Sequence, residues 1–383
     1  MFKNALRLPF KLLGIPLYLD ITFLIVLPLL AWLIGSQLPD IVTFLISVDG
    51  WPDDPSLIEP LVEGYTPFLI GFWAALALFF SVVVHELGHA VTGRFYNVET
   101  ERITLWLLGG MAHFKEMPKQ RGAEAVVAIA GPITSIALGM IFFGLASVVP
   151  IADLPGLYFV LLYTAYMNIV LAVFNMVPAL PLDGGRVLRS LLHLKMSRLR
   201  ATQIAAGISK SLAIGLGLFG LLIFDLFLIL IAFFVYMAVS AEAKYAAFTE
   251  TLSRFQVRQL MSSPVATVGP AQTLKEVLDK MMLQARVAYP VITSSGDFIG
   301  EISLENVQQA NPEQLVKEVM SRPPQTIGID EDATELFDRM MRDEQHRLLV
   351  VDGDGMVVGI VTKTDLMRAL QIASGTPQVP QSS

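Results

Sequence analysis

The chain has 383 residues, of which 54% are hydrophobic and only 16% are charged, whereas soluble globular proteins usually contain about 25% charged residues. This composition excludes an ordinary soluble protein. There is no cysteine, so disulfides, thiolate metal sites and cysteine nucleophiles are excluded, and any metal must be held by His, Asp or Glu. The formal net charge of −7 provides no basic face, and nucleic acid is therefore not an expected partner.

Long apolar runs lie almost entirely before residue 245 and divide the chain into a membrane part and a water-soluble part. A helix needs about 20 apolar residues to cross the core of a bilayer. No small-residue cleavage site follows the first apolar run, so we expect no cleavable signal peptide. We predict a polytopic α-helical membrane protein with about six transmembrane helices. The predicted spans are 19–36, 68–92, 124–148, 157–177, 203–223 and 226–243.

The last two predicted spans are separated by Asp225 and its immediate neighbours. An ionised aspartate at the centre of a bilayer would cost at least about 2.5 kcal/mol. We therefore interpret Asp225 as part of a tight hairpin turn between two spans. A single tilted span over residues 203–243 is the alternative.

Lysine and arginine are unevenly distributed over the predicted loops, and these residues concentrate in cytoplasmic loops. The segments 37–67 and 149–156 contain none, so we place both outside. With six spans, both termini and the water-soluble part are then cytoplasmic, and the plasma membrane is the expected location. The basic residues that we place inside are Lys3, Arg7, Lys11, Arg94, Arg102, Lys115, Lys119, Arg121, Arg186, Arg189, Lys195, Arg198 and Arg200.

The second predicted span contains His85-Glu86-Leu-Gly-His89, an H-E-x-x-H motif. Two histidines four residues apart share one face of a helix, so both imidazoles can reach a single zinc ion. Glu86 is then a general base, which takes a proton from the attacking water and passes it to the leaving amine. Ionisable side chains within an apolar helix are costly and usually mark a functional site. Polar packing between helices is the alternative.

A hairpin is predicted between the second and third spans, where Glu101–Phe114 has short β-prone runs around a turn at Gly109-Gly110. The segment is too short and too interrupted to span a bilayer. An exposed strand edge is a ready template for an extended peptide. Gly109 and Gly110 are therefore candidate substrate-binding residues. An ordinary amphipathic surface loop is the alternative.

Two later segments of the membrane part contain helix-breaking residues. Gly131-Pro132 in the third span is typical of close helix packing or of a kink. Segment 175–186 follows the fourth span and contains two prolines, two glycines and Asp183. A catalytic zinc usually takes three protein ligands, and Asp183 is the best candidate for the third. Asp183 could equally cap the following helix, and the residues alone leave both interpretations open.

The pair of motifs, His85-Glu-Leu-Gly-His89 and Asn175-x-x-Pro-x-x-Pro-Leu-Asp183-Gly-Gly, resembles the site-2 protease family of intramembrane metalloproteases. The resemblance covers roughly residues 14–245. It implies that the two histidines and Asp183 ligate one catalytic zinc ion, with the motif glutamate as the base. It also implies that the predicted hairpin dips into the membrane and pairs with an unwound substrate.

The resemblance further implies that Asn175 lies near the metal, where it positions the substrate or stabilises the oxyanion. An amide donor beside a polarised carbonyl is chemically suited to that role. His89 lies five residues before Arg94, which we expect to mark the cytoplasmic end of the span. At 1.5 Å per residue this places the site about one to two turns inside the membrane. Cleavage is therefore expected near the cytoplasmic side.

From Val257 onward the composition is mixed and the sequence repeats with an offset of 59 residues. Residues 261–267 align with 320–326, and 276–282 align with 335–341, with no gap needed. Each repeat predicts an amphipathic helix, a strand, a glycine-containing turn, a second strand and a further helix. The repeat resembles a tandem pair of CBS domains with an α+β fold.

In CBS pairs that bind adenosine nucleotides, residues at the positions of Thr362 and Asp365 contact the phosphates and the ribose. The resemblance therefore implies an adenine nucleotide, ATP or AMP, as a regulatory ligand. The first repeat has Asn306 at the position of Asp365, which puts a second nucleotide site in doubt. The alternatives are a packing or dimerisation module without a ligand, and an Asp365 that caps the last helix. CBS pairs often associate face to face, so a homodimer is a further expected partner.

The predicted domains are a transmembrane metalloprotease domain at 1–245, a linker at 246–256 and the CBS pair at 257–373. A disordered tail rich in Pro, Gln and Ser follows at 374–383. Three functions are compatible with these features. An intramembrane protease that cuts single-span, membrane-anchored regulators accounts for both motifs. A metal-ion transporter with CBS domains would not need the paired motifs, and a silent scaffold would not need Glu86.

Overall fold

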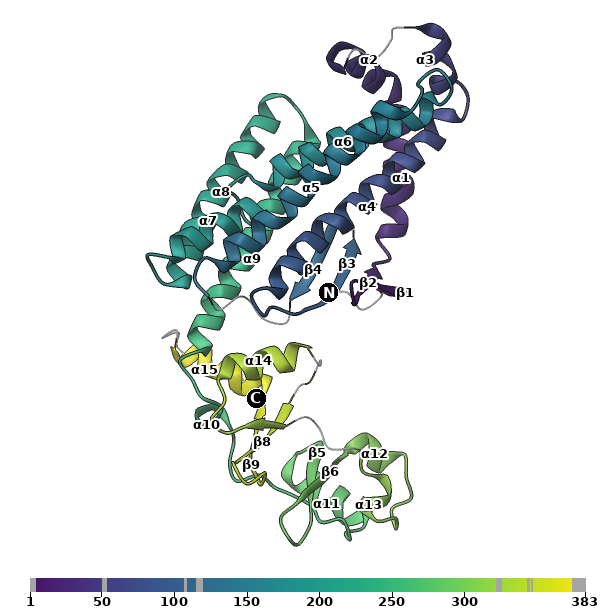
Figure 1. Ribbon diagram of the computed structural model, residues 1–383. Coiled ribbons are helices and arrows are strands. Elements are labelled where there is room, and N and C mark those ends of the chain that lie inside the picture. Colours follow the sequence, from purple (N-terminus) through teal and green to yellow (C-terminus); the bar gives the residue numbers. More distant parts are fainter. Residues whose placement is uncertain are drawn as a thin grey trace. The chain divides into compact units, whose positions relative to one another are not determined.

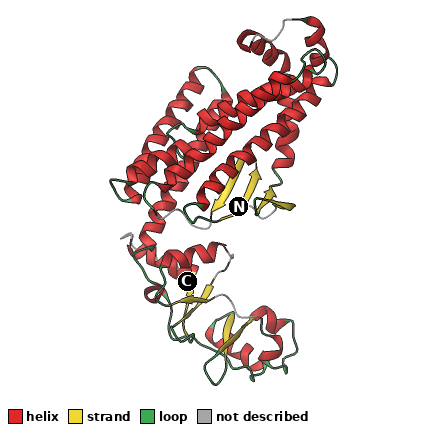
Figure 2. Ribbon diagram, viewed as in Figure 1, coloured by secondary structure: helices red, strands yellow, loops and turns green. Residues whose placement is uncertain are grey.

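The computed structural model describes residues 5–49, 54–106, 109–114, 120–321, 326–342, 345 and 347–373. The predicted tail, 374–383, and the basic residues Lys3, Lys115 and Lys119 lie outside the described residues. The chain forms two compact units, Met1–Ala243 and Lys244–Ser383. Figure 1 labels their helices and strands, and Figure 2 shows that the first unit is largely helical while the second mixes helices and strands.

The first unit is a bundle of apolar helices, and five helices within the described ranges are long and apolar enough to cross a membrane. These five are α4, α5, α6, α8 and α9. The first predicted span is instead α1, which bends by 61° into α2, and this bent pair would make a sixth span. The chain is therefore a multi-pass membrane protein. The helices are α1 (Phe23–Ser36), α2 (Leu38–Asp49), α3 (Pro55–Val62), α4 (Thr66–Arg94), α5 (Ala123–Val148), α6 (Pro155–Asn175), α7 (Asp183–His193), α8 (Arg198–Leu222) and α9 (Leu226–Leu252).

Residues 203–243 form two helices rather than one tilted span. Helix α8 ends at Leu222 and α9 begins at Leu226. The Asp225 carboxylate accepts hydrogen bonds from the backbone N–H groups of Phe227, at 2.8 Å, and Leu228, at 3.1 Å. Asp225 thus satisfies the unpaired donors at the start of α9, which explains why a charged residue occupies this turn.

A four-stranded sheet, in the order β1-β2-β3-β4, packs against α4. The predicted hairpin is β3 (Thr100–Trp106) and β4 (Gly109–Phe114), paired antiparallel. Both glycines belong to β4, so the predicted Gly-Gly turn was wrong, and residues 107–108 lie outside the described ranges. The other two strands, β1 (Leu6–Leu12) and β2 (Ile15–Leu19), were not predicted; β2 pairs in parallel with β3.

Small residues let α4 lie close to its neighbours in the bundle. A Cβ at Gly71 would collide with the carbonyl oxygen of Ala31 in α1. One at Gly88 would lie 3.0 Å from the carbonyl oxygen of Ala130 in α5. Apolar helices in a bilayer associate through such close backbone contact, because lipid offers no hydrophobic driving force between them. The residues that carry the H-E-x-x-H motif are therefore held tightly against α5.

The second unit consists of two repeats with matching elements 59 residues apart, as the sequence predicts. The first repeat comprises α10 (Val257–Leu260), α11 (Leu274–Gln284), β5 (Ala288–Ile292), β6 (Phe298–Ser303) and α12 (Leu304–Gln308). The second comprises α13 (Val316–Val319), β7 (Thr326–Gly328), α14 (Ala333–Arg342), β8 (Arg347–Val351), β9 (Val357–Thr362) and α15 (Lys363–Ala373). The start of each repeat bridges to the second strand of the other, at Ser262–Ile360 and Ser321–Glu301.

One contact between the repeats breaks their symmetry. Glu301 of β6 forms an ion pair with Arg347 of β8. The offset of 59 residues relates these two positions to Ile360 and Ala288, which are apolar. All four residues line one small space of about 10 Å³ between the strands. Burial raises the pKa of Glu301, and the guanidinium of Arg347 opposes that rise.

Candidate metal centre

Three buried side chains from two helices meet inside the first unit. His85 and His89 lie on one face of α4, and Asp183 is the first residue of α7. The Nε2 atoms of the two histidines are 3.2 Å apart. The Asp183 Oδ2 atom lies 3.1 Å from Nε2 of His85 and 3.2 Å from Nε2 of His89. The three potential ligand atoms therefore form a nearly equilateral triangle.

The size of this triangle fits a zinc ion. With ligand distances of about 2.0–2.1 Å, tetrahedral geometry places ligand atoms about 3.3 Å apart, close to the observed 3.1–3.2 Å. Two imidazoles and one carboxylate are also a common ligand set for zinc in hydrolytic enzymes, which leave the fourth position open. Within the described residues, this trio is the group of His, Asp and Glu side chains that could hold a metal ion.

Helix α5 fixes the orientation of both imidazole rings. The Nδ1 atom of His89 donates to the carbonyl oxygen of Val127 at 2.7 Å. The Nδ1 atom of His85 lies 2.8 Å from Ser135 Oγ, and the Ser135 side chain is fully buried. The Val127 carbonyl can only accept, so it selects the tautomer of His89 that leaves Nε2 free for a metal, and the Ser135 hydroxyl fixes the orientation of the His85 ring. Sequence reasoning missed both partners, although a serine within an apolar span is a usable signal.

The third contribution of α5 is the absence of a side chain at Gly131. A Cβ at this position would collide with the rings of both His85 and His89. The close packing predicted at Gly131-Pro132 is therefore a contact between the backbone of α5 and the two imidazole rings. Val127 and Ser135, one turn before and one turn after Gly131 on the same helix, hold the Nδ1 atoms of these rings, so a displacement of the rings by a Cβ at Gly131 would disturb both hydrogen bonds.

Glu86 lies beside the triangle and is in contact with strand β4. Its Oε2 atom accepts a hydrogen bond of 2.9 Å from the backbone N–H of Ala112. A Cβ at Gly110 would lie 2.7 Å from Glu86 Cγ and 2.8 Å from Val82 Cγ1, so a larger residue here would displace these two side chains. Gly109 adopts a φ of +123°, a value that side chains disfavour. The two glycines predicted to bind substrate thus bring the free edge of β4 next to the candidate general base.

Asp183 begins α7 but does not cap it. The N-cap residue is Leu182, and the Asp183 carboxylate points at the two histidines, with Oδ1 at 3.7 Å from Nη1 of Arg186. The alternative that Asp183 is a helix cap is therefore wrong. A Cβ at Gly184 or Gly185 would collide with the backbone of the preceding loop. The two glycines thus allow the loop to fold back and aim Asp183 into the bundle.

The structure does not bring every predicted residue into the metal centre. Asn175 is half-buried at the last position of α6. Among the described residues, the hydrogen bonds of His85, His89 and Asp183 do not include it. Its role stays a prediction.

The predicted nucleotide residues of the second unit are engaged with each other. Oδ2 of Asp365 accepts from the backbone N–H of Thr362 at 2.9 Å and from its hydroxyl at 2.7 Å. Ser303 and Asn306 make the same capping arrangement in the first repeat. The observed hydrogen bonds of Asp365 are thus those of a helix cap, which was the alternative interpretation. Either Asp or Asn can make this arrangement.

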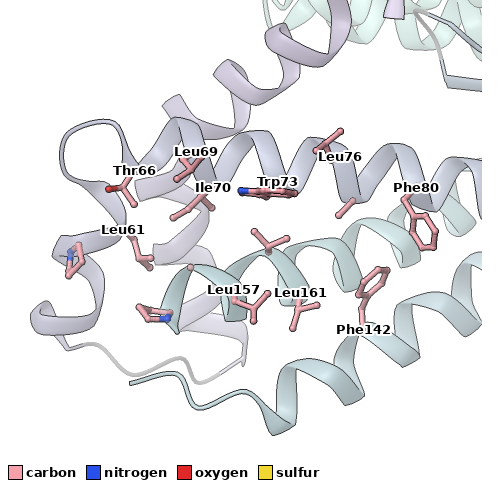
Figure 3. Close-up of a pocket in the computed structure, with 15 residues that line it drawn as sticks. Leu61, Thr66, Leu69, Ile70, Trp73, Leu76, Phe80, Phe142, Leu157 and Leu161 are labelled. Carbon is pink, nitrogen blue, oxygen red and sulfur yellow. The ribbon is translucent and has the colours of Figure 1, made fainter. Parts of the chain in front are cut away.

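A separate apolar groove of about 830 Å³ lies between α3, α4, α5 and α6. Figure 3 shows Leu69, Trp73 and Leu76 facing Leu157 and Leu161 across this space. The residues that line the groove include none of the ligand side chains, and its wall offers almost no polar group for chemistry. Trp73 precedes His85 by about three turns of α4, so the groove is distinct from the metal centre.

The model of peptidase family M50 matches residues 73–155 and 150–219, and the CBS domain model matches residues 257–312 and 316–372. Over 366 residues the chain is 33% identical to the zinc metalloprotease MJ0392 of Methanocaldococcus jannaschii, covering 95% of each chain. The chain belongs to peptidase family M50. This peptidase also resembles the stage IV sporulation protein FB of Bacillus subtilis, with 31% identity over 45% of this chain and 58% of that protein.

Among solved structures, the peptidase is similar to the site-2 protease from Methanocaldococcus jannaschii, with 32% identity and a TM-score of 0.43. That alignment covers 63% of this chain and 95% of the other. The family membership makes this chain a zinc metalloprotease of the site-2 protease type with a pair of CBS domains. It decides against the transporter interpretation of the sequence.

Proposed function

We propose that this peptidase cuts peptide bonds within the transmembrane segments of single-span, membrane-anchored proteins. His85, His89 and Asp183 would hold the zinc ion, and Glu86 would act as the general base. The observation that supports this most is the triangle of three ligand atoms, buried in an apolar helix bundle beside a carboxylate. When bound, zinc supplies Lewis acidity, which polarises the scissile carbonyl and acidifies water.

Different residues of the chain have different roles in the rest of the reaction. Glu86 takes the proton of the attacking water and returns it to the leaving nitrogen, as its position beside the triangle allows. The partners of the two histidines keep Nε2 of each ring directed at the metal. Asn175 is proposed to orient the substrate or to donate to the developing oxyanion.

Strand β4 is proposed to hold the substrate. Ala112 directs its backbone N–H away from β3 and toward Glu86, so this edge of the sheet faces the candidate metal centre. A transmembrane helix must unwind before its backbone is accessible, and pairing with a strand edge would recover part of the lost hydrogen bonding. A peptide added along Gly110–Phe114 would therefore lie within reach of the base.

The zinc-loaded protein in liposomes is expected to cleave at least one member of a panel of single-span test proteins within its span. Removal of zinc with a chelator should abolish this cleavage, and renewed zinc should restore it. Cleavage that is unaffected by the chelator, or confined to residues outside the span, would contradict the proposal.

We also propose that the protein lies in the plasma membrane with both termini and the CBS domains in the cytoplasm. The absence of cysteine allows a clean test. Glu59→Cys in α3 and Arg200→Cys in α8 both place a thiol at an exposed position. In intact cells a membrane-impermeant maleimide should label Glu59→Cys alone, and Arg200→Cys only after permeabilisation. The reverse pattern would invert the topology.

We further propose that an adenine nucleotide binds the CBS pair at Thr362 and Asp365 and regulates cleavage. The chain supplies a matched variant, because Asn306 makes the same capping arrangement as Asp365. Asp365→Asn should therefore preserve the fold of the second unit but weaken ATP or AMP binding about tenfold, through loss of a charged hydrogen-bond acceptor. Isothermal titration would measure this. Equal nucleotide affinity in both proteins would rule out Asp365 as a ribose ligand.

A further inference from the structure

A buried arginine joins three helices near the metal centre. Arg189 lies on α7, six residues after Asp183, and its side chain is only 6% exposed. Its Nη2 atom donates to Glu124 of α5, and its Nη1 atom donates to Glu242 of α9. A buried guanidinium is costly unless carboxylates pair with it, so the two glutamates and Arg189 form one interdependent ion triad.

The α5 end of this triad lies close to the support of His89. Glu124 precedes Val127 by three residues on α5, and the Val127 carbonyl holds the His89 ring. Next to Arg189, the Ser190 hydroxyl accepts a 3.1 Å hydrogen bond from the backbone N–H of Ala125. Helix α7 is thus fastened to the first turn of α5 at two adjacent positions.

At the α9 end, the triad is more exposed to solvent than at the α5 end. Glu242 is 29% exposed and lies one residue before the boundary of the first unit. Helix α9 continues past this boundary, and its residues 244–252 belong to the second unit. Within the first unit, α9 also contributes apolar packing, as in the cluster of Val239 with Leu180, and a cation–π contact of Tyr236 with Lys210. The ion pair with Glu242 is therefore a directional link between α9 and the helix that begins at Asp183.

We propose that Arg189 is a positioning residue, which holds Asp183 in register with the two histidines and makes the metal centre sensitive to the position of α9. This inference rests on the proposed function, since it assumes that Asp183 is a metal ligand. The triad is not needed for stability alone, because buried ion pairs contribute little net stability compared with apolar replacements. It is suited to fixing the relative positions of three helices.

Metal affinity of the full-length protein in detergent tests the proposal without measuring proteolysis. Co²⁺ would be titrated into metal-free protein against a competing chelator, and thermal unfolding would be followed in parallel. Arg189→Met should weaken Co²⁺ binding about 10- to 100-fold, as removal of outer supports of a metal site typically does. Arg189→Lys should give an intermediate loss, since lysine cannot bridge two carboxylates with a planar fork.

Glu242→Gln decides the role of α9, and Glu250→Gln is the matched control on the same helix. The first should weaken Co²⁺ binding about threefold or more and lower kcat without changing KM, whereas the second should match the wild type. Because Glu242 is partly exposed, this variant is expected to fold even where Arg189→Met does not. If folded Glu242→Gln and Arg189→Lys both bound Co²⁺ as tightly as the wild type, the inference about Arg189 would be overturned, but the metal centre would stand. Failure of the wild type to bind Co²⁺ would overturn the metal centre as well.

Discussion

Glu86→Gln should abolish detectable cleavage of a single-span substrate while leaving zinc bound. The substitution keeps the size of the side chain and its contact with strand β4, because an amide oxygen can accept the Ala112 hydrogen bond. It removes only the ability to take a proton from water. General bases contribute roughly 10²- to 10⁴-fold to a rate, so we expect a fall in kcat of that order, measured with zinc-loaded protein in liposomes.

Two controls make this result specific. Zinc content, measured on the same preparations, should equal that of the wild type, because the three proposed ligands are untouched. Wild-type protein treated with a chelator should lose cleavage to the same extent. Persistent cleavage by Glu86→Gln, with the same products, would remove Glu86 from the mechanism.

Gly131→Ala should disrupt the metal centre through a single methyl group. A Cβ at this position would collide with both imidazole rings, whose Nδ1 atoms are held by Val127 and Ser135 of the same helix. The rings must then rotate or α5 must move away from α4. Either change separates the Nε2 atoms from Asp183, and we expect zinc affinity to fall by at least about tenfold, in the range typical for disturbed supports of a metal site.

Gly144→Ala provides the matched control for this prediction. Gly144 lies on the same helix, and a Cβ there would meet no atom within 4 Å. Since alanine also has the higher helix propensity, this variant should keep its zinc affinity and its thermal stability. Equal zinc affinity in Gly131→Ala and Gly144→Ala would mean that the histidines bind metal in another arrangement than the one described.

The sequence could predict the helices and the motifs that carry chemistry, because both are local patterns. His85 and His89 are four residues apart on one apolar span, and the loop with Asp183 is identified by its prolines and glycines. Ser135 and Gly131 could not be assigned to the histidines, because that relation depends on how α4 and α5 pack. A buried serine or glycine in an apolar helix is compatible with many helix contacts.

The strands at the start of the chain show the same limit. Residues 6–12 and 15–19 pair with each other as a local antiparallel hairpin, but the parallel pairing of residues 15–19 with β3 joins segments that are far apart in the sequence. The location of the Gly-Gly pair was mispredicted for a related reason. Glycines often mark turns, but Gly110 lies within β4, where a Cβ would crowd the Glu86 side chain of α4. The clash involves residues far apart in the sequence.

In the second unit, the fixed offset between the repeats was sufficient to predict matching elements, since β5 and β6 of the first repeat recur as β8 and β9 of the second, although β7 has no matching strand. The sequence alone is compatible with two roles for Asp365, a ribose ligand and a helix cap. Only the structure distinguishes a carboxylate that closes a capping box from one that is unengaged.

The unequal contact between the two CBS repeats has a consequence for how they associate. If two copies of the first repeat paired with each other, Glu301 would face the position of Ala288, and its partly buried charge would lack a partner. Two copies of the second repeat would leave Arg347 facing Ile360 in the same way. A partly buried charge without a partner is less favourable than a paired one, and the mixed pair joins Glu301 to Arg347. The ion pair thus selects against like-with-like exchange of repeats between neighbouring molecules in the membrane.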